Sequence, residues 1–65
     1  MKDFMLLRDA LTDDLMLVRK SMIFKVEECH EKKKQCRRII YVDRCEDDFV
    51  TEALIDIINE LEKNS

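Results

Sequence analysis

The three cysteines and the single histidine of this chain carry the side chains best suited to bind zinc: Cys29, His30, Cys36 and Cys45. Together they offer a set of donors that suits zinc. Zinc-binding pairs usually stand two to four residues apart, whereas Cys29 and Cys36 are seven apart. On a helix that spacing separates the two thiols by ~10 Å along the axis, too far for one tetrahedral ion. We therefore expect no metal site and no cofactor, and we keep a zinc-stapled domain as an alternative.

The same part of the chain offers little for catalysis. A nucleophile needs an adjacent base and an orienting group, and on a shared helix His30 cannot easily reach Cys29 or Ser21. Neighbouring acids such as Asp13 and Asp14 fit the first turn of a helix better than a carboxylate pair in a pocket. We expect a protein that is not an enzyme and has no catalytic residues.

A block of basic side chains surrounds Cys36 and forms a candidate contact patch: Lys32, Lys33, Lys34, Arg37 and Arg38. Residues 30–45 carry six basic and two acidic side chains, but residues 46–65 carry one basic and seven acidic ones, and the net charge of the whole chain is −3. The acidic segment would repel a phosphate backbone. Nucleic acid is therefore not the expected partner, although a regulator that binds it through residues 32–44 stays open as an alternative.

The composition limits the fold and the kinds of site that the chain can build. It has 65 residues, 42% of them charged, and contains neither glycine nor proline. Phosphate-binding loops that need glycine at fixed positions are therefore excluded, and few sharp turns are expected. One domain over residues 1–65 is predicted. A chain this short buries only about 60% of the surface that it exposes when unfolded, so oligomerisation is expected to contribute to its stability.

The spacing of the apolar residues predicts helices. In the first half of the chain they recur every three or four positions, at Phe4, Leu7, Leu11, Leu15, Val18, Met22, Val26 and Cys29. This pattern predicts one long helix from Asp3 to about Gln35, with Thr12 as the residue where an N-cap could break it. A second, amphipathic helix is predicted after Asp43, with a wide apolar face that begins at Phe49. The predicted fold class is mainly α, a helical hairpin that assembles into a bundle.

One stretch favours a strand instead. β-branched and aromatic residues cluster in the segment IIYV, so the connector between the helices is assigned a short strand at 38–42. A hairpin that pairs the segment MIFKV with RRIIYV would also place two glutamates opposite two arginines, Glu27 against Arg38 and Glu28 against Arg37. The segment CHEKKKQC would then be the loop, but it lacks the usual turn residues and is rich in helix formers. The helix is therefore preferred, and the hairpin is kept as the alternative.

The first half of the chain is apolar nearly all round the predicted helix, more than one short second helix can cover. We expect a second chain to cover the rest through the interface residues Leu6, Ala10, Leu17, Phe24, Met16 and Ile23. The expected function is that of a small protein–protein interaction module of inhibitor, antitoxin or adaptor type, which forms a homodimer and binds another protein. Apolar runs of at most four residues are too short to span a membrane. An odd number of cysteines without a secretory leader predicts a cytoplasmic protein.

Overall fold

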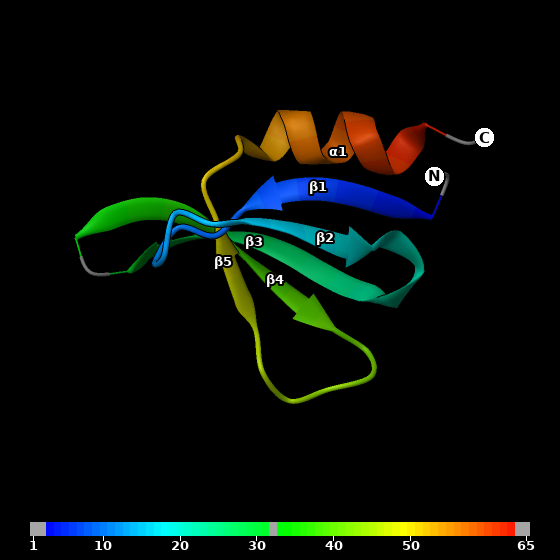
Figure 1. Ribbon diagram of the computed structural model, residues 1–65, viewed down its shortest axis with the longest axis horizontal. Helices are drawn as coiled ribbons and strands as arrows, with labels where there is room; N and C mark the ends of the chain where they lie inside the picture. The colour runs from blue at the N-terminus through cyan, green and yellow to red at the C-terminus, as the bar shows by residue number, and fades with distance from the viewer. Residues whose placement is uncertain (1–2, 32, 64–65) are drawn as a thin grey trace.

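The computed structural model describes residues 3–31 and 33–63, and within them the fold is mainly β (Figure 1). The elements follow in the order β1 (Phe4–Arg8), β2 (Leu15–Arg19), the 3₁₀ turn η1 (Lys20–Met22), β3 (Ile23–Glu31), β4 (Lys34–Tyr41), β5 (Asp48–Val50) and α1 (Leu54–Glu62). The prediction of a mainly α fold is therefore wrong, because the segment expected to form one long helix forms three strands and the start of a fourth. Within the described ranges there is neither a helical hairpin nor a helical bundle.

The apolar pattern of the first two strands explains this error. Along β1 the side chains alternate between the core and the outside, since Met5 and Leu7 are buried and Leu6 between them is exposed. β2 alternates in the same way, with Val18 buried and Leu17 exposed. Because leucines occupy the outer face as well as the core face, the alternation is hidden in the sequence. The same residues then also satisfy a helical spacing of three and four.

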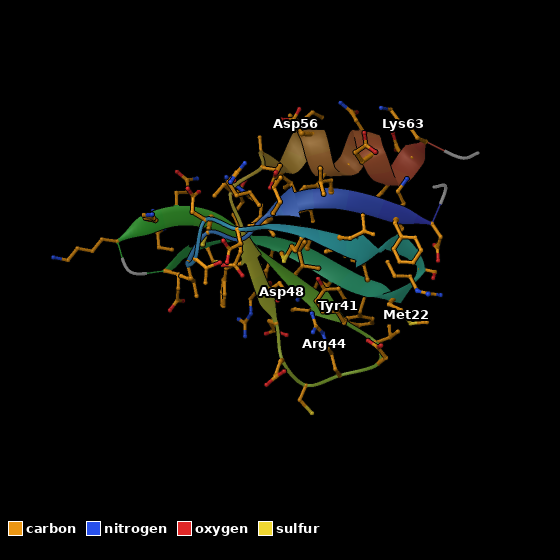
Figure 2. The ribbon with its side chains drawn as sticks, in the orientation of Figure 1. Met22, Tyr41, Arg44, Asp48, Asp56 and Lys63 are labelled. Carbon is orange, nitrogen blue, oxygen red and sulfur yellow. The ribbon has the colours of Figure 1, made fainter. Side chains whose placement is uncertain are left out.

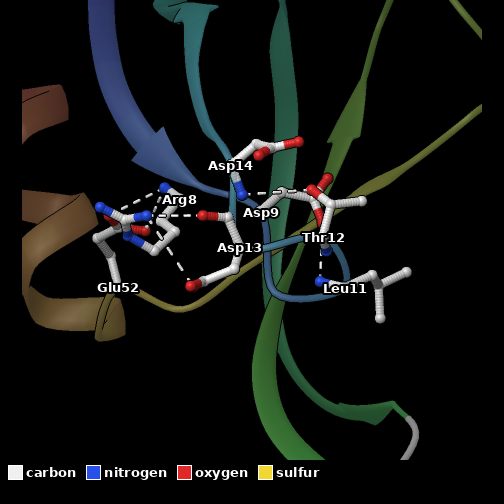
Figure 3. A network of polar contacts seen from close by, with 7 residues as sticks. All are labelled: Arg8, Asp9, Leu11, Thr12, Asp13, Asp14 and Glu52. Carbon is white, nitrogen blue, oxygen red and sulfur yellow. Dashed lines mark hydrogen bonds and ion pairs between the residues drawn. The ribbon is translucent and has the colours of Figure 1, made fainter.

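The β1–β2 loop uses aspartate in a position where glycine is common (Figure 3). Asp13 has a φ of 66°, in the left-handed region that aspartate adopts more readily than most residues. The Asp9 carboxylate accepts hydrogen bonds from the backbone N–H groups of Leu11 at 2.8 Å and Thr12 at 3.1 Å, which closes the turn. Thr12 thus lies inside a hairpin loop, and the possible N-cap considered there does not occur.

β3 and β4 form the hairpin that the sequence left as the alternative. The glutamates and arginines face each other in the expected register, Glu27 with Arg38 and Glu28 with Arg37. The ladder also continues to the ends of both strands, through most of the segment that the hairpin alternative treated as its loop. Lys33 has a φ of 64°, so it provides the left-handed residue of the turn in a chain without glycine. Most of the short strand predicted at 38–42 is the second half of β4.

The two sheets meet where β1 ends. β1 pairs with β2, and β4 pairs with both β3 and β5, all of them antiparallel. A bridge between Asp9 and Val50 joins the sheets, and beside it the Ala10 N–H donates to the Phe49 carbonyl at 2.7 Å. The described strands thus form a two-stranded sheet, β1–β2, and a three-stranded sheet, β3–β4–β5, and β2 pairs with β1 along one of its edges only.

The core lies between the strands and α1. Its buried side chains are Met5, Leu7, Val18, Ile39, Tyr41, Val50 and Ile57. α1 contacts β3 and contributes the fully buried Ile57, whereas Ile55 and Ile58 are exposed. The helix predicted after Asp43 is shorter than expected, because Phe49 lies in β5 and the chain turns helical only at Leu54.

Candidate interaction surface

The outer edge of β2 carries backbone groups that no strand of the described residues pairs. At the two ends of the β1–β2 ladder, the Asp9 N–H donates to the Asp14 carbonyl at 2.8 Å and the Lys20 N–H donates to the Asp3 carbonyl at 2.6 Å. In an antiparallel ladder the bonded residues alternate along each strand. The even-numbered residues of β2 therefore bond to β1, and the residues that direct their N–H and C=O groups to the free edge are Leu15, Leu17 and Arg19.

The outer face beside this edge is apolar. Leu6 of β1 and Leu17 of β2 are opposite each other in the ladder, and their exposed fractions are 60% and 51%. Leu15 lies two residues before Leu17, on the same face of β2, and is 55% exposed. Met5 and Leu7, on the inner face of β1, are only 3% and 1% exposed. A strand edge with unpaired backbone groups thus borders a patch of exposed leucines.

A groove of about 390 Å³ lies along the same edge. Its lining residues are Met16, Leu17, Val18, Arg19, Met22, Tyr41, Asp43, Arg44 and Asp48. Four of them are consecutive residues of β2, whose side chains alternate between faces, so what they share is the edge of the strand. The opposite wall comes from the end of β4 and the connector that leads to β5, where Figure 2 shows Tyr41, Arg44 and Asp48 close together.

Three polar residues of the groove, Tyr41, Arg44 and Asp48, are paired with one another. The Tyr41 hydroxyl and Arg44 Nη2 both donate to Asp48 Oδ2, each at 2.6 Å, and the Arg44 guanidinium lies 4.1 Å from the centroid of the Tyr41 ring. Burial, together with the hydrogen bond to Asp48, raises the pKa of Tyr41. These contacts fix the shape of the connector. They also leave no unpaired acid or base in this cluster to act as a general acid or base.

Charges of opposite sign flank β2. Asp13 and Asp14 precede the strand and are exposed, and Arg19 and Lys20 stand at its end. The Arg19 guanidinium lies 4.9 Å from the centroid of the Phe4 ring, on the outer face. β2 is therefore acidic before its first residue and basic at its end, with apolar residues between.

The six interface residues predicted from the sequence do not form one stripe. Leu6 and Leu17 lie opposite each other on the outer face, and Phe24 is 69% exposed at an irregularity of β3. Ala10 is buried, and the other two, Met16 and Ile23, are half-buried against the core. The sequence prediction missed Leu15, although its position two residues from Leu17 would have indicated it once β2 was read as a strand.

Of the four residues of the predicted basic patch that the structure describes, the two arginines are paired with acids. Arg37 pairs with Glu28 at 3.0 Å, and Arg38 pairs with Asp47 at 2.8 Å. Lys33 and Lys34 are exposed at the hairpin tip, and Lys32 lies outside the described residues. The two arginines thus serve cross-strand and connector contacts instead of forming a continuous cationic surface with the lysines.

The candidate metal ligands are only partly brought together. Cys29 and Cys36 are opposite each other in the β3–β4 ladder, with their Sγ atoms 3.4 Å apart, so the separation expected on a helix is wrong. Burial, followed by the hydrogen bond with the Cys36 thiol, raises the pKa of Cys29 to about 11. His30 is opposite Gln35, and Cys45 is exposed in the connector after β4. Among the described residues, no three His, Cys, Asp or Glu side chains are grouped closely enough to hold a metal ion.

In residues 3–31 and 33–63, no helix has the length and apolar character needed to cross a membrane.

The surface around β2 combines unpaired backbone groups, exposed leucines and a groove. Comparison with known protein families, curated proteins and solved structures gives no match.

Proposed function

We propose that the chain is a small, non-enzymatic protein-interaction module that forms a homodimer by pairing β2 with β2 of a second copy. The observation that carries this proposal is the free edge of β2 beside the exposed Leu6 and Leu17 pair. An unpaired edge next to an apolar face is the usual template for adding another strand. The helical form of the dimer expected from the sequence is replaced by a continuous sheet across the two copies.

The register of this pairing follows from the hydrogen-bonding pattern. When a two-fold axis perpendicular to the sheet relates the two strands, each residue lies opposite a residue whose side chain is on the same face of the sheet. With the axis at Leu17, Leu17 lies opposite its own copy, and Leu15 lies opposite Arg19 of the second copy. All three residues direct their N–H and C=O groups to this edge, so the pairing satisfies every backbone group that β2 leaves free.

The side chains of β2 fit the same register. On the outer face, Leu6 and Leu17 continue into their copies and form a row of leucines across four strands. On the inner face, Met16 comes to lie opposite Val18 of the second copy, at the mouth of the groove that both residues line. At the ends of the pairing, Asp14 lies opposite Lys20 of the second copy, so the charges that flank β2 attract each other twice in the dimer.

The energetic argument concerns the exposed leucines. Full burial of a leucine side chain contributes about 1.5–3 kcal/mol, and Leu6, Leu15 and Leu17 each leave at least half of that surface in water. Covering these leucines in a symmetric dimer contributes a part of this free energy twice, once in each copy. The proposal also places the protein in the cytoplasm, because its three cysteines are free and a reducing compartment keeps thiols in that form.

The test compares molar masses by light scattering after size exclusion at micromolar concentration. Wild-type chain is expected at twice 7.8 kDa. Leu17→Asp places a charge at the two-fold axis and is expected to yield a single chain with an unchanged circular dichroism spectrum. Ile55→Asp is the matched control, because Ile55 is 61% exposed on α1, away from β2, and this variant is expected to remain dimeric. A wild-type mass of one chain would overturn the proposal, as would dissociation of both variants.

A further inference from the structure

The β3–β4 hairpin holds two thiols close together at a place that the proposed dimer does not use. Cys29 and Cys36 are direct cross-strand partners, two ladder positions from the Glu27–Arg38 pair in one direction and two from the last pair of the ladder, Glu31 and Lys34, in the other. Their Sγ atoms are 3.4 Å apart, against ~2.05 Å in a disulfide. Direct partners in an antiparallel ladder have Cα atoms about 4.5–5.5 Å apart, which lies within the range that disulfides span.

We infer that Cys29 and Cys36 are a site of reversible disulfide formation, with a low-molecular-weight disulfide such as oxidised glutathione as the oxidant. The two thiols differ in access: Cys36 is fully buried, and Cys29 is partly exposed. Attack therefore begins at Cys29, the accessible thiol of the pair, and its raised pKa makes this first step the slow one near neutral pH. Cys36 is placed to complete the reaction. Cys45, the third thiol, is exposed in the connector after β4, and no contact between it and another described cysteine is seen.

The exchange proceeds in two balanced steps. The Cys29 thiolate, after loss of its proton to solvent, attacks one sulfur of the small disulfide, which releases one small thiolate and leaves a mixed disulfide on Cys29. The Cys36 thiolate then attacks Cys29 Sγ, which forms the Cys29–Cys36 bond and releases the second small thiolate. The two cysteines are oxidised, the small disulfide is reduced to two thiols, and the protein loses two hydrogen atoms.

The second step is favoured by position. The two sulfurs need to approach by little more than one ångström, and the ladder already fixes the strands that carry them. Cys29 and Cys36 are direct partners with their Sγ atoms already in contact, so no side chain of the ladder lies between them. A mixed disulfide on Cys29 is therefore expected to be short-lived whenever Cys36 is present.

The experiment treats the folded full chain with oxidised glutathione and follows its mass. Wild-type chain is expected to lose two hydrogen atoms, with peptide mapping assigning the bond to Cys29 and Cys36, while any stable adduct resides on Cys45. Cys36→Ser is expected to accumulate the adduct on Cys29 to a level at least about tenfold higher than wild type. Cys45→Ser, the matched control, is expected to form the internal disulfide at the wild-type rate.

Two results would overturn the inference. One is a stable glutathione adduct on Cys29 in wild-type chain with Cys36 still reduced. The other is no internal disulfide under conditions in which Cys45 reacts to completion. If Cys36→Ser does not fold, wild-type mapping together with Cys45→Ser still decides between these results, and neither outcome depends on whether the chain is a dimer.

Discussion

Leu6 and Leu17 lie opposite each other on β1 and β2, and both project from the outside of the sheet with more than half of their surface in water. Replacing Leu6 with threonine keeps a residue suited to a strand and removes apolar surface that the dimer would bury twice. We predict that Leu6→Thr raises the dimer dissociation constant by about tenfold and changes the free energy of unfolding of the chain by less than about 0.5 kcal/mol. Sedimentation equilibrium measures the first quantity and urea unfolding the second.

Leu11→Thr is the matched control for this variant. Leu11 is 43% exposed but lies in the β1–β2 loop, outside the proposed pairing. Its replacement is expected to leave the dissociation constant unchanged. Equal weakening by both variants would show that general surface hydrophobicity, and not the face of β2, drives association.

The charges at the ends of β2 predict a rescue experiment. In the proposed register Asp14 lies opposite Lys20 of the second copy, so Asp14→Lys and Lys20→Asp each place like charges opposite one another. Each single variant is expected to weaken the dimer several-fold, because an exposed pair contributes about 0–1 kcal/mol and occurs twice. The double variant restores opposite charges and is expected to recover most of the affinity at low salt. Additive weakening in the double variant would contradict this register.

The β1–β2 loop predicts opposite effects for two substitutions of one residue. Asp13 has a φ of 66°, which glycine adopts freely and β-branched residues adopt only with strain. Asp13→Val is expected to lower the free energy of unfolding by about 1–2 kcal/mol. Asp13→Gly is expected to change it by less than half as much. Urea unfolding of both variants checks this, and equal effects would show that the aspartate side chain, and not its backbone conformation, matters.

The pKa of Cys29 predicts how stability depends on pH. Burial raises this pKa from 9.0 to about 11, with the Cys36 thiol and Glu31 acting in the same direction and Arg38 opposing them. The folded chain therefore keeps a proton that the unfolded chain releases, so the contribution of Cys29 is complete below pH 9 and is lost as the pH rises toward about 11. Between pH 8 and pH 10.5 the urea midpoint should therefore fall by more in wild-type chain than in Cys29→Ser. Parallel falls would contradict this assignment.

Some features of the fold could be predicted from the sequence, and others could not. The Glu27 and Glu28 partners of Arg38 and Arg37 could be named in advance, because opposite charges at matching positions indicate a cross-strand register. The preference for a helix there came from the lack of turn residues, and Lys33 adopts the left-handed conformation that glycine would normally supply. Local propensity was thus overridden by tertiary pairing.

The candidate site was accessible to sequence reasoning only in part. Leu6 and Leu17 were identified as residues that a second chain should cover, since the first half of the chain has more apolar side chains than one short element can bury. Their direct pairing, and the role of Leu15, depended on a period of two that leucines on both faces had hidden. The proximity of Cys29 and Cys36 could not follow from a helical reading, because it requires the hairpin.

Residue-resolved amide hydrogen exchange of β2, measured at concentrations below and above the dimer dissociation constant, tests the central claim most directly. The amides of Met16 and Val18 bond to β1, so they are expected to be protected at both concentrations. The amides of Leu15, Leu17 and Arg19 face the free edge and are expected to become protected only at the higher concentration. The contradicting result is that these three amides exchange equally fast at both concentrations although the mass at the higher concentration is that of two chains. The dimer would then not pair through β2, and the proposed assembly would be wrong.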